Sequence, residues 1–148
     1  MTADDTEDAP EPQRHIGYLI RRAQQRHVAA WSRIVSTETS SVQYSILVVL
    51  DALGEASQRQ LCDEVDLDRS TVADLVARME RRGLVARHRS AEDARRNVVT
   101  LTALGRTERQ RLQPLVAEAN AELVALLSPA DRDALRRSLR ALLTDPAG

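Results

Sequence analysis

A ten-residue stretch, residues 87–96, holds four arginines and one histidine in a chain whose formal net charge is −1. A guanidinium group stays protonated and presents a planar fork of N–H donors that matches the oxygens of phosphates and carboxylates. These residue types at this spacing favour the binding of an anionic partner. Taken singly, such arginines more often form only a solvated surface, so the elements that carry them decide between the two interpretations.

The other reactive side chains form no recognisable site. His15, His27 and His88 are scattered and have no cysteine partner at metal-ligand spacing. The sequence contains neither a G-x-S-x-G nucleophile motif nor a glycine-rich phosphate loop. We therefore predict no catalytic residue, no metal site, no cofactor and no enzymatic activity. The single cysteine, Cys62, cannot form an internal disulfide and suits a reducing compartment.

The composition indicates a soluble protein with one folded domain. At 148 residues the chain can bury a core, and because only 2% of its residues are aromatic, with no Phe, that core must be aliphatic. No apolar run approaches the roughly 18 residues of a membrane span, and no signal-peptide pattern opens the chain. We expect a cytoplasmic location.

The near-neutral net charge hides a local asymmetry. Residues 1–12 contain five acids and no base, which predicts a disordered acidic tail. The remainder has 21 basic and 17 acidic residues, a net charge of +4, and every basic residue is an arginine. Between Arg69 and Arg96 there are eight arginines against four acids. This local positive charge would attract a polyanion.

The sequence before the arginine-rich stretch predicts a helix-turn-helix. Residues 41–53 read as an apolar helix, and Ser57 with Gln60 makes a capping box for a short second helix. A third helix begins after the N-cap Asp68 and ends at Gly83. Its inward residues are Val72, Leu75, Val76 and Met79. Its outward residues are Arg69, Ser70, Thr71, Asp74 and Arg78.

Two β-branched runs, 84–89 and 97–102, predict a hairpin with a seven-residue polar loop. A hairpin directly after a helix-turn-helix is a wing. A recognition helix fits the major groove of B-DNA, and the wing then lies near the backbone and the minor groove, whose negative potential attracts arginine. The wing residues expected to bind DNA are Arg87, Arg89, Arg95 and Arg96. Asp93 is placed to brace Arg95 within the turn.

Long helices are predicted on both sides of this winged region. Residues 13–37 and 103–127 are amphipathic, the latter with a kink expected at Pro114, and Ser128 followed by Pro129 begins a last helix. The apolar stripes of the first and last helices exceed what one small domain can cover. We expect their surplus to be buried against a second subunit.

The segment LDRSTVADLVARMERRGLVARHRSAEDARRNVVTLTALGR resembles the winged-helix core of the MarR family of bacterial transcription regulators. Asp93 and Arg95 match the family's wing motif, followed at the family's spacing by Leu101-Thr102 and Gly105. The resemblance covers roughly residues 14–145. It implies a mainly α fold with a small β-hairpin wing, in one domain of residues 13–148. Within it, the winged helix-turn-helix would span about 40–102, and dimerisation helices about 13–37 and 103–143.

The resemblance also implies a function. Members of this family are obligate homodimers that bind a pseudopalindromic DNA operator, usually as repressors, and release it on binding a small ligand or on oxidation. Arg95 would take the family's minor-groove role, and the outward residues of the third helix would face the major groove. Asp74 has two interpretations, because an acid would repel phosphates. Its carboxylate could accept a hydrogen bond from a cytosine amino group, or it could have a structural or water-mediated role.

The stretch RRAQQRHVAAW, Arg21 to Trp31, resembles the first helix of MarR-type regulators that sense protocatechuate and related aromatic acids. In those, an Arg and a His matching Arg21 and His27 hold the ligand. Trp31 would offer an apolar face to the ring, and Arg22 is the alternative clamp. The resemblance thus implies an aromatic carboxylate ligand between this helix and the winged region. The simpler interpretation is an interface histidine with surface arginines.

Two other functions stay open at this point. A winged-helix module can bind proteins instead of DNA, although such modules usually have an acidic or apolar recognition face, unlike Arg69 to Arg78. A redox-sensing regulator could use Cys62. Free cysteines are commonly small buried apolar residues, however, and Cys62 follows Leu61 in a short packed helix.

Overall fold

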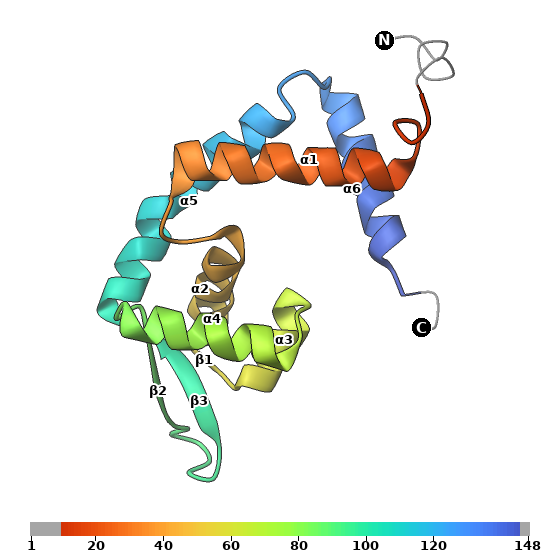
Figure 1. Cartoon of the computed structure of the whole chain (residues 1–148). Coiled ribbons are helices and arrows are strands. Elements are labelled where there is room, and N and C mark those ends of the chain that lie inside the picture. Colours follow the sequence, from red (N-terminus) through yellow and green to blue (C-terminus); the bar gives the residue numbers. More distant parts are fainter. Residues whose placement is uncertain (1–9, 146–148) are drawn as a thin grey trace. The chain divides into compact units, whose positions relative to one another are not determined.

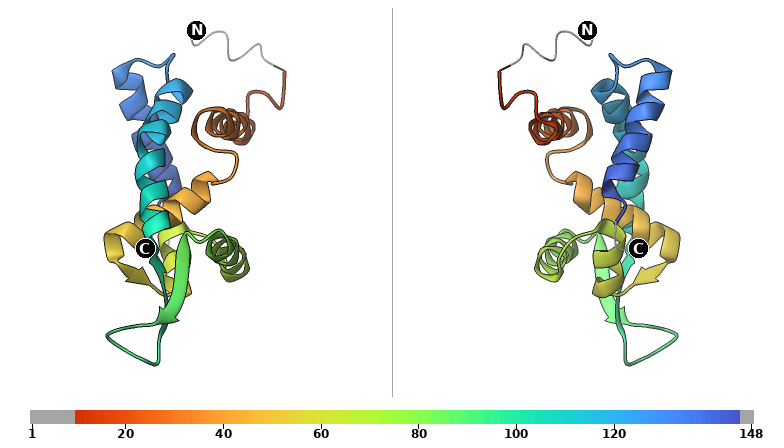
Figure 2. Two further views of the ribbon diagram at one scale, coloured as in Figure 1. Left: turned by 90° about the vertical axis from the view of Figure 1, so that its left-hand side faces the viewer. Right: turned by 90° about the vertical axis from the view of Figure 1, so that its right-hand side faces the viewer.

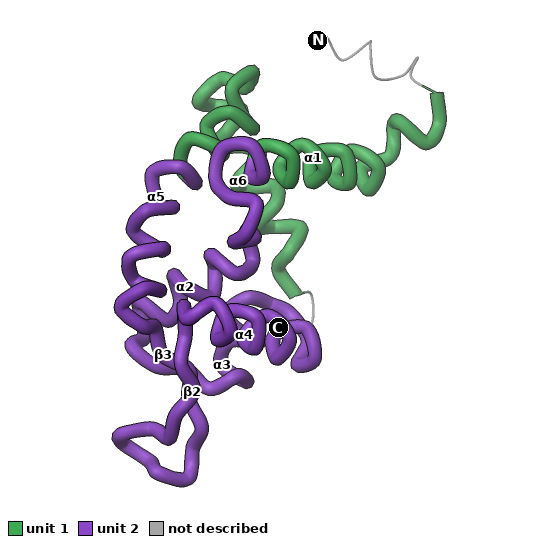
Figure 3. The backbone as a smooth tube through the Cα atoms, turned by 60° about the vertical axis from the view of Figure 1, so that its left-hand side comes forward, with its two compact units in different colours: residues 1–30, 117–148 green, residues 31–116 purple. Residues whose placement is uncertain are grey.

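The computed structural model describes residues 10–145, which divide into two compact units (Figure 3). Residues 31–116 form one, here called the winged unit. Residues up to 30 and from 117 onward form the other, the helical unit. Most of the predicted acidic tail, residues 1–9, lies outside the described residues.

The winged unit contains a helix-turn-helix followed by a hairpin (Figure 1). Its elements are α2 (Ser41–Leu53), β1 (Glu55–Ala56), α3 (Gln58–Val65), α4 (Arg69–Arg81), β2 (Val85–Arg89), β3 (Asn97–Leu101) and the first part of α5 (Ala103–Leu123). Figures 1 and 2 both show the β2–β3 hairpin extending beyond the helices of this unit. The predicted helix-turn-helix and wing are therefore confirmed, with boundaries within one residue at most ends.

Side-chain caps set where these helices begin. Asp68 accepts the backbone N–H of Thr71 at the start of α4, and Ser57 and Gln60 form the predicted capping box of α3. A second capping box, Ser40 with Gln43, begins α2 and was not predicted. Such caps satisfy backbone donors that have no partner within the helix.

The sheet has three antiparallel strands in the order β1-β3-β2. In the hairpin Val85 pairs with Leu101 and Arg89 with Asn97, which leaves residues 90–96 as the seven-residue loop. The two-residue strand β1 pairs Glu55 with Thr100 and was not predicted, because two residues carry no periodicity.

The core of the winged unit is aliphatic, as the composition predicts. Its buried residues are Ile46, Leu47, Leu50, Ala56, Leu61, Val72, Val76, Met79, Leu84, Val85, Val99 and Leu101. At the start of α5, a Cβ on Gly105 would overlap the backbone carbonyl of Leu84. Only glycine therefore lets this helix approach the hairpin so closely.

The helical unit consists of α1 (Ile16–Ala30), the end of α5 and α6 (Pro129–Leu143). Ser128 caps α6 with Pro129 at its first turn, as predicted. The predicted helix 13–37 is shorter than expected: α1 begins at Ile16 and passes into a π-helical turn, Trp31–Val35. The bond from the Ser36 N–H to the Trp31 carbonyl, 3.1 Å, closes this wider turn.

Candidate nucleic-acid interface

Helix α4 presents the polar face that the sequence predicts. Val72, Val76 and Met79 are completely buried and Leu75 is half-buried, so the opposite side faces solvent. The exposed residues on that side include Arg69, Ser70, Thr71, Asp74 and Arg78. Their orientation is confirmed, and their contact with DNA stays a prediction.

The hydroxyls of Ser70 and Thr71 are engaged in the cap of their own helix. Ser70 Oγ donates to Asp68 Oδ2 at 2.5 Å, and Thr71 Oγ1 donates to Oδ1 at 2.6 Å. These two hydroxyls, then the Thr71 N–H, hold the pKa of Asp68 far below its usual range. Phosphate oxygens only accept hydrogen bonds, so either hydroxyl would have to leave Asp68 to donate to DNA.

Three of the four predicted wing arginines are held by neighbours within the winged unit. The Arg87 Nε lies 3.7 Å from Glu80 Oε1 of α4, and Arg89 donates to the Ala94 carbonyl at 2.7 Å. Arg96 donates through Nη2 to Gln60 Oε1 of α3. The Arg89 and Arg96 contacts brace the loop against β2 and α3, and the Arg87 contact joins β2 to α4.

Arg95 differs from these three arginines. Its backbone N–H donates to Asp93 Oδ1 at 3.0 Å, so Asp93 does brace Arg95 within the turn, through the main chain. Among residues 10–145, the Arg95 guanidinium has no hydrogen bond or ion pair, and the residue is exposed. The loop thus fixes the backbone of Arg95 and leaves its charge available to an external anion.

Sequence reasoning missed two side chains that support the wing. Ser90 is 5% exposed, and its Oγ donates to Glu55 Oε1 at 2.7 Å. Gln60 receives Arg96 on the same oxygen that accepts the Ser57 N–H of the α3 capping box. Both contacts join residues more than thirty positions apart, and no local pattern indicates them.

The predicted ligand-binding residues lie in different surroundings. The Arg21 guanidinium lies over the Tyr18 ring, 5.3 Å from its centroid, and Arg22 donates to Gln25 at 3.0 Å. His27 lines an apolar groove of about 750 Å³ in the helical unit, and Arg21 lines another depression with Gly17 and Gln24. Trp31, in the winged unit, is 7% exposed. Arg21 and His27 thus line different hollows of the helical unit, and Trp31 belongs to the other unit.

Cys62 is half-buried and packs against the core of the winged unit. Within residues 10–145 no group of three or more His, Cys, Asp or Glu could hold a metal ion. Over the same residues, no helix has the length and apolar character needed to span a bilayer.

The chain is similar to known transcription regulators. A family model described as the MarR family matches residues 39–96. The structure of the PcaV transcriptional regulator of Streptomyces coelicolor, in complex with its natural ligand, is 36% identical, with a TM-score of 0.85 over 95% of this chain and 99% of that chain. The chain is also similar to BpsR of Bordetella bronchiseptica, whose solved structure concerns the regulation of its DNA binding by 6-hydroxynicotinic acid. The two sequences are 28% identical, and the structures align with a TM-score of 0.86 over 93% of this chain and 99% of the BpsR chain. The transcriptional repressor NicR of Pseudomonas putida is 27% identical over 86% of this chain and 82% of NicR.

Proposed function

The chain belongs to the MarR family of transcriptional regulators, and we propose that it is a dimeric repressor whose binding to a pseudopalindromic operator is relieved by an aromatic acid. In this proposal α4 enters the major groove and the wing reaches the adjacent minor groove. NicR, which is named a repressor, supports the direction of regulation.

The observation that carries DNA binding is the free guanidinium of Arg95 on a braced loop. Because the contacts of Arg89, Arg96 and Asp93 fix the loop, Arg95 meets DNA without first ordering its own backbone, which lowers the entropic cost of binding. The other three arginines add positive charge along the same surface, which favours association with a polyanion.

The experiment is a binding titration over a salt series, with the DNA upstream of the protein's own gene and a scrambled duplex. We expect Arg95→Ala to weaken operator binding by roughly 1–3 kcal/mol. The slope of log K against log salt should become shallower by about one charge, because one phosphate contact is lost. Arg137→Ala, which removes the same charge from exposed α6, is the matched control. Wild-type affinity for Arg95→Ala at moderate salt would rule out this role for Arg95, and equal binding of both duplexes by wild type would rule out operator recognition.

The apolar groove of the helical unit supports the dimer. It is lined by α1, the end of α5 and α6, and its wall includes Leu19, Ile20, Leu135 and Leu139, each at least 40% exposed in a single chain. A contiguous apolar surface of this kind marks a protein interface. In the proposed dimer, the two recognition helices would read half-sites about one turn of DNA apart, roughly 34 Å.

The ligand proposal rests on residue chemistry and on relatives. Arg21 offers a planar fork to a carboxylate, and His27 can bond a carboxylate or a ring hydroxyl. BpsR is regulated by 6-hydroxynicotinic acid, an aromatic hydroxy acid. We therefore propose the same chemical class for this chain, with Arg22 as the alternative clamp and Trp31 as the apolar face.

A further inference from the structure

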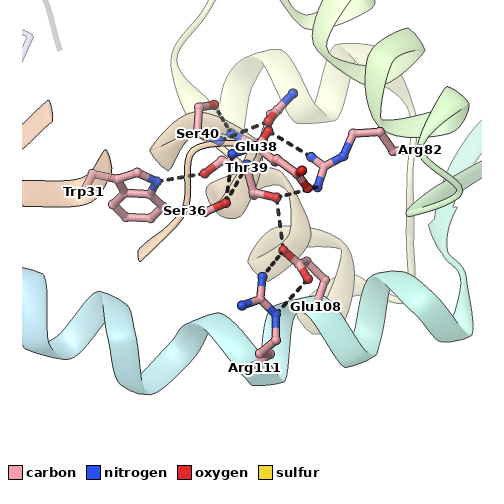
Figure 4. Close-up of polar contacts among 9 residues, drawn as sticks. Trp31, Ser36, Glu38, Thr39, Ser40, Arg82, Glu108 and Arg111 are labelled. Atoms are coloured by element: carbon pink, nitrogen blue, oxygen red, sulfur yellow. Dashed lines mark hydrogen bonds and ion pairs between the residues drawn. The ribbon is translucent and has the colours of Figure 1, made fainter. Parts of the chain in front are cut away.

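A polar cluster inside the winged unit surrounds Thr39, at the N-terminal end of α2 (Figure 4). Thr39 is completely buried, and its backbone and side chain bond to four different residues. The cluster consists of Trp31, Ser36, Glu38, Thr39, Arg82, Glu108 and Arg111, and we call it the Thr39 cluster.

The Thr39 hydroxyl joins α4 to α5. Arg82 Nη2 donates to Thr39 Oγ1 at 3.0 Å, and Thr39 Oγ1 donates to Glu108 Oε1 at 3.2 Å. A hydroxyl has one proton, a guanidinium can only donate, and an ionised carboxylate can only accept. The direction of both bonds is therefore fixed, and neither partner can exchange roles with the other.

Each outer partner of the hydroxyl is itself held. Arg82, which follows the last residue of α4, also donates to the Glu38 carbonyl at 3.0 Å. Glu108, whose side chain is 14% exposed, receives Nη2 of Arg111 at 2.8 Å and Nε at 3.2 Å. The bonds and charge of Arg111, and to a smaller extent the bond from Thr39, keep the pKa of Glu108 below its usual value. The carboxylate therefore stays ionised near neutral pH.

A third segment meets the same residue. The Trp31 indole N–H donates to the Thr39 carbonyl at 2.8 Å, and its ring packs against Tyr44 with the centroids 5.8 Å apart. Trp31 begins the π-helical turn after α1, and such turns are frequent at functional sites. One buried threonine thus connects this turn, the end of α4 and the first half of α5.

We propose that Arg82 and Glu108 are positioning residues for operator recognition: acting through Thr39, they fix the orientation of the recognition helix α4 against α5, with Trp31 bonded to the same junction. Neither residue needs to touch DNA in this role. A helix held at its C-terminal end by two directed, charge-assisted bonds has little freedom to tilt. The inference rests on the proposed function, because it assigns these residues to the binding of DNA by α4.

The test compares Thr39→Val, which keeps the shape and loses the hydroxyl, with Thr39→Ser, which keeps the hydroxyl. Glu108→Gln keeps an acceptor and removes the charge. We expect Thr39→Val and Glu108→Gln to weaken operator binding per folded molecule by roughly 2- to 30-fold, the range for mutations within coupled networks. Thr39→Ser should bind as wild type. Non-specific binding and the slope of log K against log salt should not change, because no phosphate contact is lost.

A double variant separates positioning from general destabilisation. If the two residues act through one junction, Thr39→Val with Glu108→Gln should lose no more operator affinity than the worse single variant. A stoichiometric titration with operator DNA gives the fraction of the protein that is folded and competent to bind, so that unfolding is not counted as weaker binding. Unchanged operator affinity in both single variants, or losses that add fully, would overturn the proposal. A salt slope reduced by about one charge in Arg82→Gln would overturn it too, since Arg82 would then be a phosphate contact.

Trp31 gives a readout that does not involve DNA. It is the only tryptophan of the chain, so intrinsic fluorescence reports directly on the Thr39 cluster. We expect Glu108→Gln to shift the Trp31 emission of the folded protein without DNA, and Arg106→Gln, at an exposed position of α5, to leave it unchanged. An unshifted spectrum in Glu108→Gln would show that the junction is not coupled to Trp31. If the shift occurs but wild type does not prefer the operator, the proposed function fails and the positioning role falls with it, while the coupling itself stands.

Discussion

The Asp74 carboxylate lies 3.1 Å from Nη2 of Arg78, one turn further along the exposed face of α4. Both side chains are more than half exposed, so the pair contributes little to stability. Its position on the predicted recognition face matters more. An acid among arginines that are proposed to face DNA would repel phosphates, and the Asp74–Arg78 pair restrains one of the cations that would otherwise reach them.

Removing Asp74 should therefore strengthen binding to DNA in general. We expect Asp74→Ala to bind a scrambled duplex more tightly, with log K against log salt steeper by about one charge. The free energy of unfolding should change by less than about 0.5 kcal/mol, the usual value of an exposed helical pair. Fluorescence anisotropy at several salt concentrations and urea unfolding measure the two quantities.

The operator titration gives the second half of this test. If Asp74 acts only by repelling phosphates, Asp74→Ala should strengthen binding to the operator and to the scrambled duplex by about the same factor and leave the ratio of the two affinities unchanged. Glu64→Ala, at an exposed acid of α3, is the charge-matched control. A fall in operator affinity alone would instead identify Asp74 as a base-contacting residue, which accepts from a cytosine amino group.

Assembly can be tested on α6. Leu139 is 40% exposed and lines the apolar groove, so Leu139→Arg should place a charge in the proposed dimer interface and yield monomers. Monomers should lose operator affinity, because only one half-site is then bound. Sedimentation velocity at micromolar concentration measures the oligomeric state, and Arg137→Ala, at an exposed position of the same helix, is the control. A well-folded wild-type monomer at that concentration would exclude the obligate dimer.

The Thr39 cluster predicts a dependence of stability on pH. The pKa of Glu108 is lowered in the folded protein, mainly by its bonds from Arg111. The folded state therefore gains stability above the ordinary glutamate pKa, and this gain is lost as the pH falls through the lower folded pKa. Glu108→Gln should be less stable than wild type at pH 7, and the difference should shrink below about pH 4.5. Urea unfolding at a series of pH values measures it, and a constant difference down to pH 3.5 would contradict the assignment.

The sequence was most informative where a local signal determines structure. The N-cap Asp68 and the stripe of Val72, Val76 and Met79 placed α4 and its exposed face correctly. The hairpin followed from two β-branched runs separated by a polar loop. The signals for these features lie in residues that are close together in the sequence, so periodicity, capping residues and loop composition predict them.

Contacts between distant residues could not be predicted in the same way. Thr39 and Glu108 are 69 positions apart, and nothing near either residue indicates the bond between them. The assignment of Ser70 and Thr71 to DNA, made from their outward position and the family resemblance, stays a prediction, and the sequence did not indicate that both hydroxyls bond to Asp68. A polar residue close to a cap can serve the cap first, and only the geometry decides this.

Ligand binding can be tested through its effect on thermal stability and on release of the operator. A ligand acts on DNA binding only through its different affinities for the two states of the protein, so a 100-fold preference for the non-binding state gives at most about 2.7 kcal/mol of relief. We expect hydroxylated benzoates to raise the melting temperature and to release the operator, because they bind the folded dimer.

Arg21→Ala should abolish both effects and keep DNA binding, since Arg21 is not on the winged unit. Arg26→Ala removes an equal charge from an exposed position of α1 and should leave both effects intact. Thermal shift with a panel of acids, followed by operator titration at saturating ligand, measures them. If no acid shifts the melting temperature, or if the shift survives the loss of both Arg21 and Arg22, the ligand proposal fails, and the role of Arg95 in DNA binding is unaffected because it depends on the wing alone.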